Sequence, residues 1–330
     1  MRFKGRFALL SLALGLSGCL DPSAPGNLVP ATVAEDPTLP RIEVNGTLLH
    51  AEAFGDPHAP MIVILHGGPG GDYRAFLPYK ALADDGYYVV FWDNRGAGLS
   101  QRHDAGDYDF DSYLEDLRQV IEHYSTSSAQ PVIFLGHSWG AMYATWFINT
   151  YGDYGGRVIG AVLSEPGAFT RDGLEDYLAQ QFPPWGLTSE ALNDVAFMDQ
   201  VMSADDHARA DYMVAAAVLA GAPQEHNDRK NPAPFWRKGA VLRTALLKIG
   251  LDDGFDWTTH LGDYPHKVLF LRGELNENLP LAHQQELASH YASSEVVTIQ
   301  GTGHEVMWEK QDECLARIRA YLDEIGGGAQ

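Results

Sequence analysis

The chain has 330 residues, of which 45% are hydrophobic, enough for one large α/β domain with an insertion or for two domains. Its 44 acidic residues outnumber 23 Lys and Arg residues, which gives a formal net charge of −21 and argues against a nucleic acid as partner. The pattern contains neither a Cys/His cluster typical of zinc nor a glycine-rich loop typical of dinucleotide binding, so we expect no metal and no cofactor.

The first 18 residues have the pattern of a secretion signal. Basic residues at positions 2, 4 and 6 precede an apolar run, Phe7 to Leu16, that is too short to span a bilayer comfortably. Leu16-Ser17-Gly18-Cys19 resembles a bacterial lipobox, in which the cysteine follows the cleavage site. We therefore expect a signal peptide at 1–18 and a lipid on Cys19, which would attach the protein to a membrane. The alternative is an ordinary secretory signal with an incidental cysteine.

Residue 20 is leucine rather than an acid, so the inner-membrane retention signal of Gram-negative lipoproteins is absent. This favours the cell envelope, at the outer membrane, as the location. Residues 19–40 contain five prolines among small and polar residues and no periodic apolar face, which predicts a disordered tether. The other cysteine, Cys314, lies on the apolar side of a C-terminal helical pattern, where we expect a buried free thiol.

From residue 41 onward, apolar runs rich in β-forming residues alternate with helical patterns. Strands are expected at 41–44, 47–54, 61–65, 87–92, 131–135, 158–163, 267–271 and 295–299, and helices at 110–124, 141–151, 280–291 and near the C-terminus. The alternation predicts an α/β fold with a mostly parallel eight-stranded sheet and helices on both faces.

The pattern changes between residues 167 and 262. Helical stretches are expected there at 174–181, 189–202, 205–219 and 239–249, separated by clusters of Pro and Trp. We interpret this block as a helical cap inserted after the sixth strand, over the strand ends where ligands bind in such sheets. The catalytic core would then consist of 41–166 and 263–330, with the cap at 167–262.

Gly136-His137-Ser138-Trp139-Gly140 lies between a predicted strand and a predicted helix, which is the context of a nucleophile elbow. The turn is so tight that it needs glycines on both sides of the serine. The turn would place the Ser138 hydroxyl above the edge of the sheet, at the N-terminus of the helix. There the backbone N–H of Trp139 can bind an oxyanion.

Two further loops follow predicted strands. In His66-Gly67-Gly68-Pro69-Gly70, the glycines allow the backbone to approach a substrate carbonyl, and the N–H of Gly68 is the candidate second oxyanion donor. In the loop from Asp93 to Ser100, we expect an ion pair between Asp93 and Arg95 that braces the loop.

Among thirteen histidines, His304 fits a general base, because it follows the last strand on a Gly-flanked loop, late in the chain. His66 and His137 lie beside the key turns, and we expect them to pack or to brace loops.

Together these motifs resemble the α/β-hydrolase fold and, within it, the proline iminopeptidase-like serine peptidases. The resemblance covers roughly residues 41–325 and rests on four motifs in matching order and spacing, HGGPG at 66–70, DNRGAGLS at 93–100, GHSWG at 136–140 and GTGH at 301–304. It implies a cofactor-free serine hydrolase that releases N-terminal proline or another small residue from short peptides through an acyl-enzyme.

The chain departs from this family at the acid of the triad. The family places an Asp three residues after the glycine of the seventh strand, where this chain has Asn276. An amide can orient an imidazole but does not stabilise the imidazolium as a carboxylate does. Glu165, at the end of the sixth strand, and Glu274 and Glu277, which flank Asn276, are the alternatives, and the site could also lack an acid.

Aminopeptidases of this group hold the substrate amine with carboxylates near the cap, which implies Glu274 and Glu277 as substrate-binding residues unless they are solvated loop acids. Trp185, with Phe182, Phe235 and Trp236, would form an apolar pocket for a proline ring, or the core of the cap itself.

Two other functions stay open. One is an esterase or amidase that acts on a small acyl substrate, because this fold hosts many chemistries. The other is a non-catalytic surface binding protein, which Asn276 favours.

Overall fold

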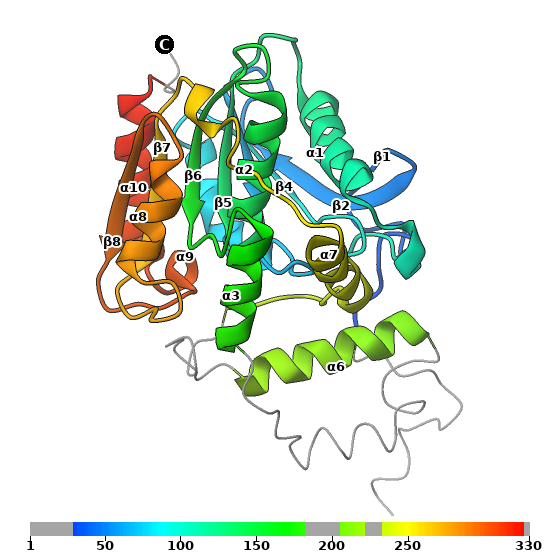
Figure 1. The fold of residues 1–330 in the computed structure, drawn as a ribbon. Helices are drawn as coiled ribbons and strands as arrows, with labels where there is room; N and C mark the ends of the chain where they lie inside the picture. Colours follow the sequence, from blue (N-terminus) through cyan, green and yellow to red (C-terminus); the bar gives the residue numbers. More distant parts are fainter. Residues whose placement is uncertain (1–28, 182–204, 222–232, 327–330) are drawn as a thin grey trace, which may run out of the picture.

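The computed structural model describes residues 29–181, 205–221 and 233–326. Eight strands form one sheet in the order β1-β2-β4-β3-β5-β6-β7-β8 (Figure 1). The strands are β1 (Arg41–Val44), β2 (Thr47–Phe54), β3 (Met61–Leu65), β4 (Tyr88–Trp92), β5 (Val132–His137), β6 (Val158–Ser164), β7 (Val268–Gly273) and β8 (Ser294–Ile299). The first two strand pairs are antiparallel and the others are parallel, which confirms the predicted mostly parallel sheet.

Helices cover both faces of this sheet. The helices of the core are α1 (Phe110–Tyr124), α2 (Trp139–Tyr151), α8 (Leu281–Ser289), α9 (Val306–Glu309) and α10 (Gln311–Glu324). Buried residues of α1, α2 and α8 share one apolar cluster, and those of α9 and α10 share the cluster on the other face. Short 3-10 helices add η1 (Arg74–Ala83), η2 (Ala105–Asp107) and η3 (Leu261–Asp263). The sequence pattern did not predict η1, which contains Pro78.

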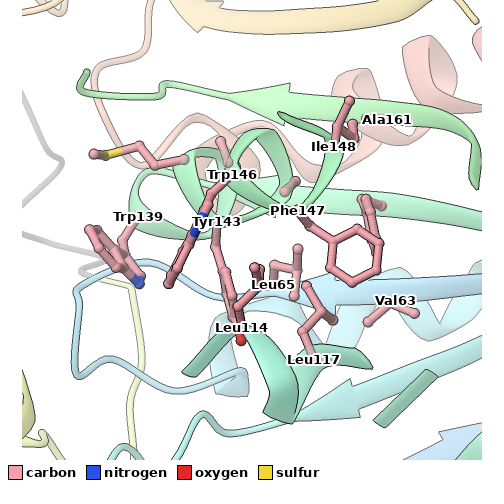
Figure 2. Packing of buried hydrophobic residues seen from close by; sticks show 14 of the residues in the cluster. Val63, Leu65, Leu114, Leu117, Trp139, Tyr143, Trp146, Phe147, Ile148 and Ala161 are labelled. Carbon is pink, nitrogen blue, oxygen red and sulfur yellow. The ribbon is translucent and has the colours of Figure 1, made fainter. Parts of the chain in front are cut away.

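The apolar cluster around α2 fixes the turn that precedes this helix. Figure 2 shows side chains of α2, β3 and α1 gathered in one cluster that includes Tyr143, Phe147, Val63, Leu65, Leu114 and Leu117. Burial of each large apolar side chain contributes about 1.5–3 kcal/mol. Trp139, the first residue of α2, belongs to the same cluster and packs edge-on against Tyr113. The start of α2 is therefore held from within the core.

Three described α-helices lie between β6 and β7: α3 (Arg171–Gln181), α6 (Asp206–Gly221) and α7 (Ala240–Asp252). They correspond to three of the four expected helical stretches, whereas the stretch at 189–202 lies outside the described residues. We refer to α3, α6 and α7 as the inserted helices. In Figure 1, α6 lies farther from the sheet than α3 and α7.

Backbone hydrogen bonds join the segment before α7 to the loop that follows β3. The N–H of Gly239 donates to the carbonyl of Gly70 at 2.7 Å. A buried carboxylate, Asp211 of α6, accepts from Arg102 at 3.0 Å and from Arg237 at 2.7 Å. The inserted helices therefore contact the loops at the carboxyl ends of β3 and β4.

Residues 29–40 are the described part of the expected tether at 19–40. In residues 29–40 the side chains of Thr32 and Val33 are buried, with Val33 0% exposed, whereas most of the other residues are exposed. The N–H of Val33 donates to Leu99 at 2.8 Å, and Arg237 donates to the carbonyl of Pro30 at 2.9 Å. Because these partners come from distant parts of the chain, the local composition gave no sign of the packing.

Candidate active site

Ser138 lies between β5 and α2 with φ 53° and ψ −118°, a backbone conformation rare for a residue with a side chain. Gly136 and Gly140 have to be glycines because other backbone atoms lie too close to leave room for a Cβ. A Cβ on Gly140 would lie 1.9 Å from the carbonyl oxygen of Leu65, and a Cβ on Gly136 would lie 2.6 Å from that of Gly140. The N–H of Ser138 donates to the carbonyl of Ser164 at 2.7 Å. Three strand ends, those of β3, β5 and β6, thus meet at this serine.

The two predicted oxyanion donors come from neighbouring segments. A Cβ on Gly67 would lie 3.2 Å from the Cβ of Ser138, so the loop after β3 touches the turn after β5. Gly68 has φ 139°, and a Cβ there would lie 2.5 Å from the nitrogen of Gly70. The N–H of Trp139 is at the first position of α2, where a helix leaves N–H groups without an intrahelical acceptor. This arrangement supports Gly68 and Trp139 as donors.

His66 and His137 brace loops, as predicted. His66 Nδ1 donates to the carbonyl of Gly67 at 2.9 Å, and His66 Nε2 accepts from the N–H of Asn94 at 3.0 Å. His137 Nε2 lies 2.8 Å from the carbonyl oxygen of His304. Burial lowers the pKa of both imidazoles, so both rings are held in the neutral form. The residue before Ser138 thus ties down the loop that carries His304.

His304 lies on the loop between β8 and α9, with 6% of its surface exposed. The loop is fixed by Glu309 of α9, whose carboxylate accepts from Thr302 and, at 3.1 Å, from the N–H of Gly303. A Cβ on Gly273 would lie 2.1 Å from the carbonyl oxygen of Gly303, so only a glycine at the end of β7 allows this loop to pack there.

Of the three candidate acids, the structure brings Glu165 to His304. Glu165 follows β6, is 0% exposed and has φ 52°. Its Oε2 lies 3.7 Å from Nδ1 of His304, and its Oε1 accepts from the N–H of Gly273. Its Oε2 also accepts from the side-chain amide of Asn276 at 2.6 Å. Glu165 is therefore the candidate triad acid, a buried carboxylate beside the imidazole but not hydrogen-bonded to it in this structure.

Glu274 and Glu277 are placed differently. Both side chains are exposed, and Glu274 Oε2 accepts from the N–H of Gly301 at 3.0 Å. Glu274 therefore holds the turn after β8.

The expected ion pair between Asp93 and Arg95 is wrong. Asp93 accepts from His50 at 2.7 Å and from the backbone N–H groups of Tyr73 and Leu99. Arg95 instead makes two hydrogen bonds to Asp116, at 2.8 and 2.7 Å. The sequence held a signal for Asp116, an acid within the apolar face of α1 that includes Leu117.

Some predicted residues lie outside the described part of the chain: Cys19, Phe182 and Trp185. Trp236 packs edge-on against Tyr73 and His50, with ring centroids 5.0 and 5.2 Å apart. It therefore joins the segment before α7 to the core. Cys314 is buried, as predicted, and burial raises the pKa of its thiol to about 12.

Residues 29–181, 205–221 and 233–326 contain no group of three or more His, Cys, Asp or Glu side chains arranged to hold a metal ion. None of the helices in these ranges has the length and apolar character needed to cross a membrane.

The fold and the arrangement around Ser138 define the class of protein. The model of the alpha/beta hydrolase family matches residues 62–317, and the chain belongs to that family.

Among similar proteins is epoxide hydrolase A of Mycobacterium tuberculosis, 28% identical over 87% of this chain and 97% of the relative. Proline iminopeptidase PfmaB of Pestalotiopsis fici is 24% identical, over 86% of this chain and 99% of the relative. A proline iminopeptidase of Saccharolobus solfataricus is also 24% identical, over 80% of this chain and 85% of its own.

Solved structures show the same fold. The proline iminopeptidase of Mycobacterium smegmatis has a TM-score of 0.59 at 17% identity, over 87% of this chain and 98% of its own. A thermophilic esterase from Thermogutta terrifontis has a TM-score of 0.65 at 18% identity, over 87% of this chain and 99% of its own.

Proposed function

We propose that the protein is a serine hydrolase that cleaves acyl compounds through an acyl-enzyme. The observation that carries this proposal is the position of Ser138, which is held in a strained conformation where the glycine loop after β3 and the His304 loop meet. Strained residues of this kind cluster at active sites, because the surrounding fold has to hold them in place.

Each residue has a role in this mechanism. His304 takes the proton of Ser138 through Nε2, because Nδ1 faces Glu165. Ser138 Oγ bonds to the substrate carbonyl carbon, and the N–H groups of Gly68 and Trp139 bind the oxyanion. The leaving group departs with the proton from His304, and water then repeats the sequence on the acyl-enzyme. Glu165 stabilises the imidazolium in both steps.

The nucleophile also bears on the substrate class. If a serine oxygen opened an epoxide, it would form an ether, and the base-catalysed step that releases an acyl group does not cleave an ether. An acyl-serine ester, by contrast, is hydrolysed by a water that His304 activates. Ser138 therefore favours acyl substrates, although an epoxide hydrolase is among the similar proteins.

Within this class, the activity we propose first is that of an aminopeptidase that releases N-terminal proline or another small residue. The motifs around Gly68, Ser138 and His304 and the similarity to two proline iminopeptidases support it. In this proposal Glu274 and Glu277 bind the substrate amine.

An esterase or amidase on a small acyl substrate is the second candidate. The exposure of Glu274 and Glu277 favours it, because an ammonium group gains most from a carboxylate that is buried beside it.

A fluorophosphonate probe tests the class. We expect fast labelling of the wild type and none of Ser138→Ala, which removes only the nucleophile and leaves the fold intact. Equal slow labelling of both proteins would reject the mechanism and favour the non-catalytic binding protein.

The substrate class needs a second assay. Prolyl-naphthylamide and its N-acetyl form differ in the amine alone, so an aminopeptidase should prefer the free amine strongly. Equal turnover of both, or faster turnover of simple esters, would favour the esterase or amidase.

We further propose that Cys19 carries lipid and holds the enzyme to the cell envelope, at the outer membrane. The basic start, the short apolar run and Leu16-Ser17-Gly18-Cys19 support this location.

A further inference from the structure

Asn276 stands where the resembling family carries its acid, yet both ends of its amide are in use. The residue is 2% exposed. Its Nδ2 donates to Glu165 Oε2 at 2.6 Å, and its Oδ1 accepts from the N–H of Asn278 at 3.2 Å. Nδ2 also lies 3.4 Å from Nδ1 of His304. The amide is therefore a direct neighbour of both the carboxylate and the imidazole.

The direction of this amide is fixed by its neighbours. If its oxygen and nitrogen exchanged places, Oδ1 would face the carboxylate of Glu165, and Nδ2 would face the N–H of Asn278. Both contacts would be repulsive, whereas the observed orientation gives a charge-assisted hydrogen bond. The N–H of Gly273 donates to the other carboxylate oxygen, so each oxygen of Glu165 accepts one hydrogen bond.

Charge explains why an amide stands at this position. An aspartate at 276 would place a second carboxylate oxygen where Nδ2 now lies, 2.6 Å from Glu165 Oε2. Two buried carboxylates at such a distance repel each other, and the proton that relieves this repulsion resides on one of them or on the imidazole beside them. An acid at the end of β6 and an amide after β7 therefore belong together.

We propose that Asn276 is the positioning residue of the Glu165–His304 pair: its amide holds the Glu165 carboxylate toward Nδ1 of His304 and keeps a single negative charge beside the imidazole. The inference rests on the proposed function, since it assigns a role within the same site. We expect the 3.7 Å between Glu165 Oε2 and His304 Nδ1 to shorten to a hydrogen bond when substrate binds, because catalytic hydrogen bonds are often long without substrate.

Other titratable groups surround His304 and have to stay constant in a test. They are His137 on β5, Glu305 beside His304 in the chain and Glu309 on α9. None of the variants below changes them, so a shifted pH profile reports on Glu165 and position 276.

The first test adds charge. The measurement is kcat/KM for p-nitrophenyl acetate against pH. In Asn276→Asp we expect the acid limb to move to higher pH by about one unit, because a second carboxylate holds the proton on the imidazole. Asn278→Asp is the matched control, since it adds the same charge two residues away on a half-buried side chain. We expect its limb to move by less than about 0.3 unit, in keeping with solvent screening.

The second test exchanges the two groups. Glu165→Gln should lower kcat by about four orders of magnitude, as loss of a triad acid does. The double variant Glu165→Gln/Asn276→Asp keeps one carboxylate and one amide of similar size, so it should recover at least about 100-fold of this loss. Circular dichroism checks that each variant folds, and the double variant decides the question if Asn276→Asp does not fold.

Two results would overturn the inference: a double variant no more active than Glu165→Gln alone, or identical pH profiles for Asn276→Asp and Asn278→Asp. Fluorophosphonate labelling separates this failure from that of the proposed function. A wild type that labels normally while either result is found refutes the role of Asn276 alone. A wild type that does not label refutes the serine hydrolase and this inference with it.

Discussion

Replacing Asp72 with Asn should change how the stability of the protein depends on pH. Asp72 lies on the loop that contains Gly68, and it is 6% exposed. Its Oδ2 accepts from the N–H groups of Trp236 and Arg237, at 2.7 and 3.1 Å, so it joins this loop to the segment before α7. Burial, and then the charge of Asp93, raise the pKa of the Asp72 carboxyl to about 6.

The sign of the effect follows from this shift. The ordinary pKa of the group is 3.8, so between about pH 4 and 6 the folded protein binds a proton that the unfolded chain does not. Lowering the pH therefore stabilises the fold through Asp72, and this contribution is lost as the pH rises through about 6. For a pKa of about 6 when folded and 3.8 when unfolded, the free energy of unfolding gains about 1.3 kcal/mol between pH 7 and pH 5.

Urea unfolding of the wild type and of Asp72→Asn, at both pH values, measures this contribution. Other groups titrate in both proteins, so the difference between the two proteins isolates Asp72. We expect this difference to change by about 1.3 kcal/mol in favour of the wild type on going from pH 7 to pH 5. A difference that stays constant within about 0.3 kcal/mol would refute the reasoning, because Asp72 would then titrate alike in both states.

Two other predictions concern the lipid and a buried ion pair. Cys19→Ser should move the protein from the membrane fraction to the soluble fraction in cell fractionation, and a variant that stays in the membrane fraction would show another means of attachment. Asp116→Ala should lower the free energy of unfolding by about 3–5 kcal/mol, because it leaves Arg95 buried without its carboxylate. Glu115→Ala, which breaks a partly exposed ion pair with Arg118, should change it by less than about 1 kcal/mol, and equal effects would contradict this account.

The fold was predictable because each strand carries its own signal. β3 is an unbroken apolar run whose five residues are all buried, and Asn45-Gly46 is a two-residue turn between β1 and β2. Gly136 and Gly140 marked the turn around Ser138 for a local reason, the absence of room for a Cβ. These features depend only on residues that are neighbours in the chain, so they can be predicted from the sequence.

Features that depend on distant partners were not predictable in the same way. The choice among Glu165, Glu274 and Glu277 depends on the register of β6 against β7, where Ser164 pairs with Leu271 and so places Glu165 beside Gly273. No local pattern states that register. The burial of Val33 and the partner of Arg95 depended likewise on segments far away in the sequence.

The contacts of Pro30 and Val33 bear on the proposed lipid anchor at Cys19. Arg237 and Leu99 fix the chain from Pro30 onward beside the inserted helices. With lipid on Cys19, only ten residues lie between the lipidated cysteine and Pro30, a reach of at most about 40 Å. The active site would then sample a thin layer above the membrane rather than the whole compartment. Its working substrate concentration would be the one found at the lipid surface.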